Sequence, residues 1–235
     1  MSIENAGRRG RPASAGSRRP KPPAGSPFVV AIVGPAGSGK STLARSLAGP
    51  RTRVLDADRY GHEITDGDAA VRIALAAEYG ADVYRADGTL DRARVAARVF
   101  SDLAARERLN QLVHPRIVTR IRDTILGLIR DGWQGVVVVD AALMLDWHLE
   151  RACDAVLAVV APEADQIARL RAARGWSKAE VQARLAVQRT NEAFARAADA
   201  TLENHGSEPA LAEAARAALR GLIEARRSRA PSGST

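Results

Sequence analysis

The residues with the most definite chemistry lie at positions 34–42. Gly34-Pro35-Ala36-Gly37-Ser38-Gly39-Lys40-Ser41 has the spacing G-x-x-x-x-G-K-[ST], and Thr42 follows it. Glycines let a backbone curl so that its N–H groups converge on phosphate oxygens at a helix N-terminus. Lys40 supplies positive charge for the β- and γ-phosphates, and the Ser41 hydroxyl can bind Mg²⁺. The segment therefore predicts a binding loop for a nucleoside triphosphate.

Three aspartates come directly after apolar stretches. Asp56 and Asp58 follow residues 52–55, and Asp140 follows residues 135–139. Ligands of α/β folds bind at the carboxyl edge of the sheet, where a carboxylate can accept the proton of an attacking hydroxyl. Asp140 is placed to act on Mg²⁺ through water. Helix or turn capping is the plainer interpretation of each aspartate.

These residues must be positioned by a parallel sheet. Short, continuously apolar stretches at 28–33, 52–55, 135–139, 155–160 and 199–202 alternate with helical patterns. Strands that are apolar on both faces indicate a parallel sheet covered by helices on each side. We therefore expect an α/β fold of the P-loop NTPase type with a five-stranded parallel sheet.

The helical patterns predict where the remaining elements lie. A helix should follow the loop up to about residue 48, and helices should span 163–173, 178–190 and 208–226. Helical spacing also covers 69–129, with an interruption expected at Gly88. A second interruption is expected at His114-Pro115, because proline favours a helix end.

Composition limits the class of protein. The 235 residues are 46% hydrophobic but 4% aromatic, so an aliphatic, largely helical core is expected. A single cysteine, Cys153, fits a reducing compartment. No apolar stretch has the length of a membrane span. We expect a soluble cytoplasmic protein with no membrane contact; its oligomeric state cannot be predicted.

The net charge of +8 belongs mainly to the ends of the chain. Residues 1–27 carry six basic residues and one acidic residue, whereas 28–223 is nearly balanced. This proline- and arginine-rich leader is expected to be disordered. Arg9-Gly10-Arg11-Pro12 resembles an AT-hook core, which would give weak DNA contact through the minor groove. A solvated basic tail is the plainer interpretation.

The chain resembles the dephospho-coenzyme A kinase family over most of residues 28–206. Besides the loop and Asp56-Ala57-Asp58, the resemblance rests on a set of motifs in a fixed order. They are Tyr79-Gly80-Ala81-Asp82, Asp87-Gly88-Thr89-Leu90-Asp91-Arg92, Arg98-Val99-Phe100, 109–117 with His114-Pro115, Arg169-Leu170 with Arg174, Arg184–Gln188, Ala198-Asp199 and Glu203-Asn204-His205-Gly206.

The resemblance implies ATP-dependent phosphorylation of the ribose 3′-hydroxyl of dephospho-coenzyme A. It also implies a nucleoside-monophosphate-kinase type of fold. The expected nucleotide-binding core is 28–58, 132–162 and 195–227; a helical acceptor subdomain follows at 59–131, a lid at 163–194 and a flexible tail at 228–235.

The resemblance also implies roles for individual residues. Asp58 would be the catalytic base, Arg169 and Arg174 would reach the transferring phosphates from the lid, and Asn204 and Gly206 would lie beside adenine. Arg92 and His114 would contact the acceptor. A surface role for the two lid arginines and a helix end at His114 are the plainer alternatives. The tryptophans are expected to pack, with Trp176 at the lid surface.

Two segments depart from the family pattern. Ala142-Leu143-Met144-Leu145-Asp146 stands where P-L-L-x-E is usual, and Glu192-Ala193 stands where E-K is common. The departures concern the acceptor side. The alternatives are therefore another P-loop kinase, acting on a nucleoside, nucleotide or sugar hydroxyl, and a non-catalytic ATP-binding regulator tethered to DNA by the leader. Intact Lys40 and Asp58 argue against the regulator.

Overall fold

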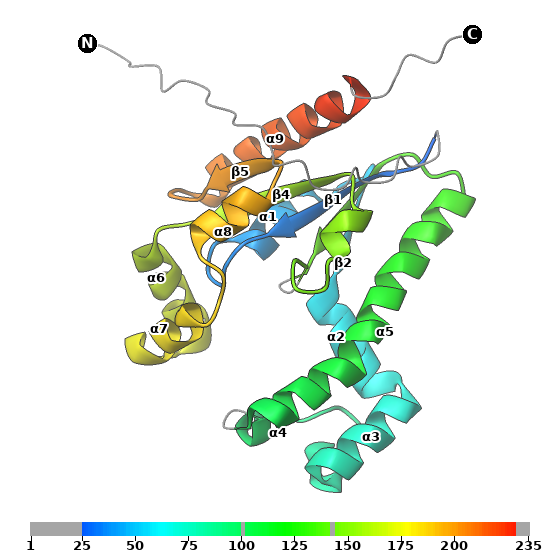
Figure 1. Ribbon diagram of the computed structural model, residues 1–235, viewed down its shortest axis with the longest axis vertical. Helices are drawn as coiled ribbons and strands as arrows, with labels where there is room; N and C mark the ends of the chain where they lie inside the picture. Colours follow the sequence, from blue (N-terminus) through cyan, green and yellow to red (C-terminus); the bar gives the residue numbers. More distant parts are fainter. Residues whose placement is uncertain (1–24, 100–101, 142–143, 229–235) are drawn as a thin grey trace.

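A five-stranded, all-parallel sheet forms the centre of the computed structural model, which describes residues 25–99, 102–141 and 144–228 (Figure 1). The strand order is β2-β3-β1-β4-β5. The strands are β1 (Phe28–Val33), β2 (Thr52–Asp56), β3 (Val136–Asp140), β4 (Ala155–Val160) and β5 (Ala200–Glu203). The predicted fold class and the five predicted strands are confirmed, with ends that differ by a residue or so.

Helices cover both faces of the sheet and extend beyond it. They are α1 (Lys40–Leu47), α2 (Ala57–Gly67), α3 (Ala69–Tyr79), α4 (Arg92–Val99), α5 (Leu103–Arg130), α6 (Glu163–Arg174), α7 (Lys178–Ala186), α8 (Asn191–Ala197) and α9 (Glu208–Ser228), with 3₁₀ turns η1 (Ala81–Val83) and η2 (Leu149–Ala152). Figure 1 shows α2–α5 and α6–α7 as two projections from the same side of the sheet. We call them the helical arm (57–130) and the α6–α7 lobe (163–186).

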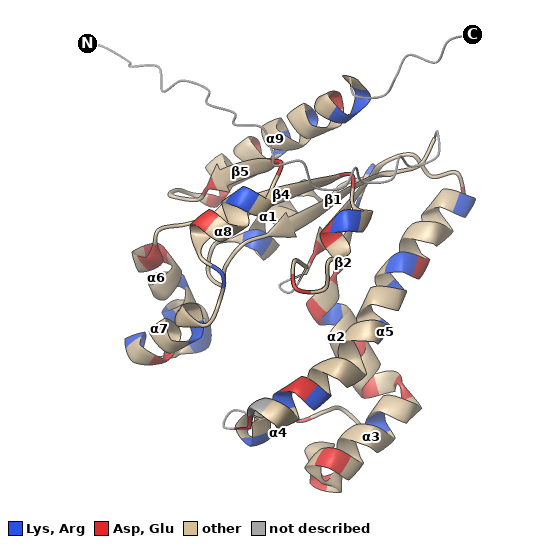
Figure 2. Ribbon diagram, in the orientation of Figure 1, with Lys and Arg blue, Asp and Glu red and all other residues tan. Residues whose placement is uncertain are grey.

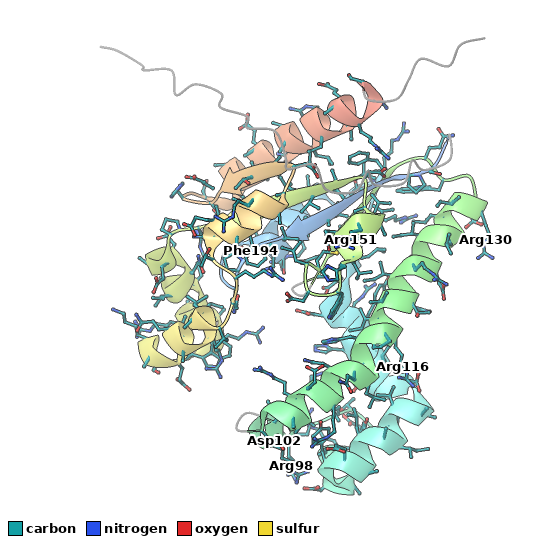
Figure 3. The ribbon with its side chains drawn as sticks, viewed as in Figure 1. Arg98, Asp102, Arg116, Arg130, Arg151 and Phe194 are labelled. Atoms are coloured by element: carbon teal, nitrogen blue, oxygen red, sulfur yellow. The ribbon has the colours of Figure 1, made fainter. Side chains whose placement is uncertain are left out.

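The two faces of β1 explain why this strand is apolar throughout. Val30 and Ile32 pack with α1 and α9, whereas Val29, Ala31 and Val33 belong to the cluster that includes residues of α5 and α8. The residue that α8 contributes to this cluster is Phe194, which is buried and labelled in Figure 3. A strand buried on both faces needs no polar alternation, so the continuous apolar pattern was a valid signal of a central parallel strand.

The helix end predicted at His114-Pro115 is wrong, because α5 is one helix of 28 residues that passes through Pro115. Val113, Ile117 and Ile121 are all buried on one side of this helix. A proline within a helix costs about 3 kcal/mol, whereas each buried aliphatic side chain contributes about 1.5–3 kcal/mol. Tertiary burial along α5 therefore outweighs the local cost of proline.

The predicted helix at 178–190 is shorter than expected. It ends at Ala186, and α8 begins separately at Asn191, with the Thr190 side chain accepting a hydrogen bond from the Ala193 N–H. That threonine cap starts a new helix, so residues 187–190 form a connection. The interruption expected at Gly88 is confirmed, since this residue lies between η1 and α4 with φ 84°.

Charge is mixed over the folded body. Figure 2 shows basic and acidic positions interspersed along α5 and α9. Within 25–99, 102–141 and 144–228, no helix combines the length and apolarity needed to cross a bilayer. The AT-hook-like residues 9–12, most of the predicted leader and tail, and Ala142-Leu143 lie outside the described residues.

Candidate active site

The predicted phosphate-binding loop connects β1 to α1, as its motif requires. Gly34 and Gly39 have φ values of 150° and 103°. A Cβ at Gly34 would lie 2.0 Å from the Val159 carbonyl oxygen, and one at Gly39 would lie 2.4 Å from Asn204 Nδ2. Gly34 is therefore required by its close approach to backbone as well as by its positive φ. At Gly39 the positive φ is combined with close packing against the Asn204 side chain.

The loop leads directly into the N-terminus of α1. Gly39 is the N-cap residue, and no side chain caps this end of the helix. The backbone N–H groups of the first turn are available to phosphate oxygens, and the helix dipole favours negative charge there.

Lys40 lies at the start of α1 beside the carboxylates of the sheet edge. Its Nζ donates a hydrogen bond to the Pro35 carbonyl, 2.9 Å away within the same loop. Burial lowers the pKa of Lys40, and the Asp140 and Asp58 carboxylates partly offset this shift. The ammonium group thus belongs to one electrostatic cluster with the two aspartates.

The parallel register brings the aspartates together. Asp56 and Asp140 are partners in the β2–β3 ladder, at the carboxyl edge of the sheet. Asp140 is buried, and this burial raises its pKa; a hydrogen bond from Ser41 and the charge of Lys40 oppose that shift. The Ser41 hydroxyl therefore lies within hydrogen-bonding reach of the Asp140 carboxylate.

Asp56 and Asp58 have different surroundings. The Asp56 carboxylate caps α2 by accepting a hydrogen bond of 3.0 Å from the Arg59 N–H, whereas Asp58 lies in the first turn of α2 and is exposed. The capping interpretation is thus correct for Asp56. Asp58 presents its carboxylate to solvent near Lys40 and Asp140, whose pKa values it influences.

Arg169 of α6 contacts the backbone of the loop. Its guanidinium donates hydrogen bonds to the carbonyl oxygens of Gly37, Ser38 and Asn204 at 3.2, 3.4 and 3.1 Å. Arg174 lies at the end of the same helix and is exposed. The structure brings Arg169, and not Arg174, to the loop.

A cavity of about 400 Å³ opens beside the loop. Asn204 and Gly206 line it together with the loop, α6 and the start of α9. Asn204 is buried, and its Nδ2 donates a hydrogen bond of 2.8 Å to the Ser38 carbonyl. The two residues predicted beside adenine therefore lie next to the loop.

The two arm residues that were predicted to contact the acceptor substrate each bind another side chain of the protein. Arg92 forms an ion pair with Asp66, with Nη2 2.9 Å from Oδ2, and also donates to the His62 carbonyl. His114 accepts a hydrogen bond of 3.0 Å from Trp147 Nε1 at its Nδ1 atom. Burial lowers the pKa of His114. The bond to Nδ1 assigns the proton of the neutral imidazole to Nε2.

Two site contacts were not predicted from the sequence. Trp147 was expected only to pack, yet its ring also lies 4.4 Å from the His114 ring, between centroids. Asp146, in the departing segment, pairs with Arg189 at 2.7 Å. The sequence marked Trp147 only by its position directly after the departing segment. It did not identify His114 as the partner of Trp147, because the two residues are 33 positions apart.

Comparison with known proteins places this geometry in a family. The family model described as dephospho-CoA kinase matches residues 28–209. A dephospho-CoA kinase of Thermobifida fusca is 35% identical over 182 residues, 77% of this chain and 90% of that protein. One of Anaeromyxobacter dehalogenans is 36% identical over 203 residues, 86% of this chain and 96% of its own length.

A solved structure agrees with the fold. A Thermus thermophilus protein superposes with a TM-score of 0.67 at 29% identity, covering 84% of this chain and 98% of its own. A dephospho-CoA kinase from Campylobacter jejuni, at 20% identity and TM-score 0.56, shares the fold. The family resemblance inferred from the sequence is confirmed, and a P-loop kinase implies ATP as a substrate.

Proposed function

This chain belongs to the dephospho-CoA kinase family, and we propose that it transfers the γ-phosphate of ATP to the ribose 3′-hydroxyl of dephospho-CoA. The observation that carries the proposal is the grouping of Lys40, Ser41 and Asp140 beside the exposed carboxylate of Asp58. This grouping supplies phosphate binding and a base at one edge of the sheet.

Asp58 would act as the general base. Its carboxylate takes the proton of the 3′-hydroxyl as the hydroxyl oxygen forms a bond to the γ-phosphorus. The bond from that phosphorus to the β–γ bridging oxygen breaks, and ADP leaves with the electron pair. Asp56 is engaged as a helix cap, which favours Asp58 for this role.

Positive charge would stabilise the transferring group. Lys40 would exchange its bond to the Pro35 carbonyl for phosphate oxygens, which are stronger, charged acceptors. Arg169 holds the loop in shape through its carbonyl oxygens and lies at the cavity beside it. Arg174 would reach the phosphates only if the α6–α7 lobe moves, as a lid does.

Ser41 and Asp140 would hold Mg²⁺ together with the phosphates of ATP. Among the described residues, no cluster of three or more His, Cys, Asp or Glu side chains is arranged to hold a metal ion. Mg²⁺ at kinase sites uses one or two protein ligands plus phosphates and water, so this donor pair fits. When bound, Mg²⁺ supplies charge neutralisation at the β- and γ-phosphates.

The helical arm would bind the acceptor, and the cavity lined by Asn204 and Gly206 would receive adenine. His114 would offer its Nε2–H to the acceptor as a neutral donor, and Arg92 would shape this region through its bond to Asp66. We place the enzyme in the cytoplasm, which its one buried cysteine supports. DNA contact by the leader stays a prediction.

The proposal is tested by measuring ADP release from Mg·ATP with and without dephospho-CoA and identifying the product by mass. ADP release that requires the acceptor, in equal amount to the coenzyme A formed, is expected. Release that does not depend on dephospho-CoA, with no coenzyme A formed, would contradict it and direct attention to nucleosides, nucleotides and sugars.

A further inference from the structure

The connection that follows α7 contacts the phosphate-binding loop. Gln188 Oε1 accepts a hydrogen bond from the Ala36 N–H at 2.9 Å, across 152 positions of sequence. Ala36 is the third residue of the G-x-x-x-x-G-K-[ST] segment. An amide oxygen from the α6–α7 side of the molecule is therefore bound to an N–H group of the loop itself.

The Gln188 side chain is oriented by its own helix end. Its Nε2 donates a hydrogen bond of 3.2 Å to the Arg184 carbonyl, and its backbone N–H donates to the Leu185 carbonyl at 3.0 Å. These bonds use the last carbonyl groups of α7, which have no partner within the helix. With the NH₂ group engaged in this way, the amide oxygen is directed toward Ala36.

The next residue attaches the same connection to the other side of the site. Arg189 donates from Nε and Nη2 to Asp146 Oδ1 at 3.1 and 2.7 Å. Asp146 lies in the segment after β3, whose last residue is Asp140. An exposed ion pair adds little stability by itself, but this one places the connection beside the segment that follows β3.

The α6–α7 lobe is thus attached to the loop at two places, one within α6 and one directly after α7. Arg169 of α6 binds the loop carbonyl oxygens of Gly37 and Ser38, and Gln188 after α7 binds the loop N–H of Ala36. A glutamine suits this second contact, because its neutral oxygen accepts from the loop without adding negative charge beside a triphosphate.

We infer that Gln188 is a positioning residue that holds the α7 end of the lobe against the phosphate-binding loop during phosphoryl transfer. This inference rests on the proposed function. With the α7 end held, water is kept from the γ-phosphate and the acceptor hydroxyl is the favoured nucleophile. Without the Gln188 contact, the α7 end moves more freely and hydrolysis competes with transfer.

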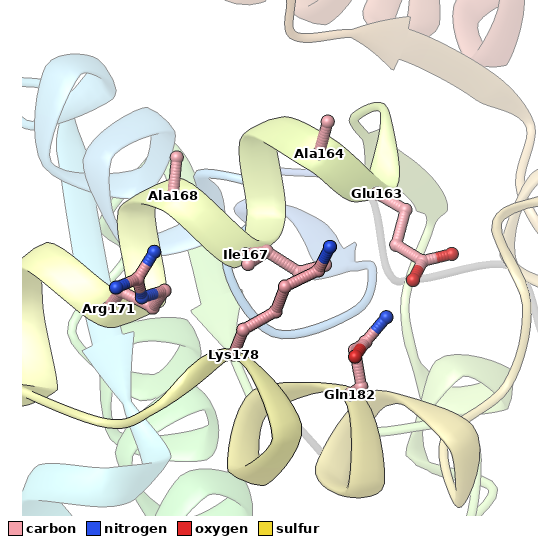
Figure 4. Close-up of a pocket in the computed structure, with 7 residues that line it drawn as sticks. All are labelled: Glu163, Ala164, Ile167, Ala168, Arg171, Lys178 and Gln182. Carbon is pink, nitrogen blue, oxygen red and sulfur yellow. The ribbon is translucent and has the colours of Figure 1, made fainter.

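The test uses Gln188→Met, which keeps the length of the side chain and removes the acceptor oxygen. Gln182→Met is the matched control, because Gln182 lies on α7 and lines the hollow of about 410 Å³ between α6 and α7 (Figure 4). The measured quantity is the rate of ATP hydrolysis without acceptor divided by the rate of transfer to dephospho-CoA.

We expect Gln188→Met to raise this ratio about 3- to 10-fold, the range of one lost hydrogen bond, with no change in Gln182→Met. Both side chains are exposed, so neither substitution should change the melting temperature. Hydrogen exchange of the loop amides in the nucleotide-free enzyme gives a second measure. It should be faster in Gln188→Met only.

An unchanged ratio together with unchanged loop exchange in Gln188→Met would overturn the inference. An equal rise of the ratio in both variants would overturn it as well, since the effect would then belong to α7 in general. If wild-type enzyme transfers nothing to dephospho-CoA, the proposed function fails, and the exchange measurement still decides whether Gln188 holds the loop.

Discussion

The nucleotide side of the molecule and the helical arm build their sites in different ways. Around residues 34–42 the site is made mainly of backbone: glycines that pack against Val159 and Asn204, and an uncapped helix N-terminus. In the arm, the proposed site residues are side chains held by other side chains, Arg92 by Asp66 and His114 by Trp147.

This difference explains why motifs predict one side better than the other. A backbone cradle needs particular residue types at fixed spacing, so the spacing itself carries the information. A side-chain site depends on partners that are distant in sequence, and residue type alone does not say whether an arginine meets a substrate or an aspartate. Substitutions on the two sides should therefore differ in size and in kind.

The largest effect is expected at the sheet edge, where the two sides meet. Asp58→Asn should lower kcat about 10²- to 10⁴-fold with the KM for ATP nearly kept, because it removes the proposed general base and no proposed phosphate contact. Asp56→Asn is the matched control: asparagine also caps helices, so kcat should change little. Steady-state kinetics of both variants decide the matter; equal losses would remove Asp58 from the role of base.

Lys40→Met should reduce kcat/KM for ATP about 10²- to 10³-fold, the loss typical of removing one positioned donor from a transition state. Both ATP binding and turnover should suffer, since Lys40 is proposed to contact the phosphates before and during transfer. ATP affinity from calorimetry and turnover from ADP release separate the two. Unchanged affinity would place the ammonium group away from the phosphates.

Arg169→Ala should reduce kcat/KM for ATP about 10-fold or more, because three loop-side carbonyl groups lose a charged donor. Arg174→Ala, on the same helix, tests lid closure separately. It should leave ATP affinity unchanged and lower kcat. If Arg174→Ala instead weakens ATP binding as much as Arg169→Ala does, Arg169 is not the one arginine of α6 that supports the loop.

The smallest effect is expected in the arm. Burial keeps the pKa of His114 low, and the Trp147 N–H bond to its Nδ1 also favours the neutral ring. Trp147→Phe removes that bond but keeps most of the burial, so the pKa of His114 should rise only part of the way toward its ordinary value, as measured by NMR titration. The KM for dephospho-CoA should rise less than about 10-fold. A histidine whose pKa is lowered by folding binds fewer protons when folded. Wild-type stability should therefore fall as pH decreases through the ordinary histidine pKa, about 6.5.

If Trp147→Phe leaves the His114 titration unchanged, the hydrogen bond does not hold the neutral imidazole. Trp133→Phe serves as the control, since Trp133 packs against the same core cluster and its ring faces the Arg53 guanidinium. It should leave the titration of His114 as in wild type.

Most of the fold was predictable, because local patterns agree with tertiary structure in the sheet. The apolar strands, the glycine-rich loop and the aspartates at strand ends all lie where their patterns indicated. Two helices differ from their predictions. The passage of α5 through Pro115 follows from burial of Val113 and Ile117, which a local rule for proline does not include. The helix predicted at 178–190 ends at Ala186, because the Thr190 cap starts a new helix.

The site was predictable only in part. Residue type and position after a strand did not distinguish Asp56 from Asp58, whereas the structure shows Asp56 capping α2 through the Arg59 N–H. The contacts of Trp147 with His114 and of Gln188 with Ala36 join residues 33 and 152 positions apart. Such contacts join segments that are distant in sequence, and the type of a single residue does not indicate its partner.

Transfer to the 3′-hydroxyl can be tested by comparing two acceptors that differ only in that group. Wild-type enzyme with Mg·ATP would be given dephospho-CoA or its 3′-deoxy analogue, and ADP and product mass would be measured. We expect coenzyme A and equimolar ADP from dephospho-CoA, and no phosphorylated product from the 3′-deoxy analogue. Phosphorylation of the 3′-deoxy analogue, or of neither compound, would contradict this expectation.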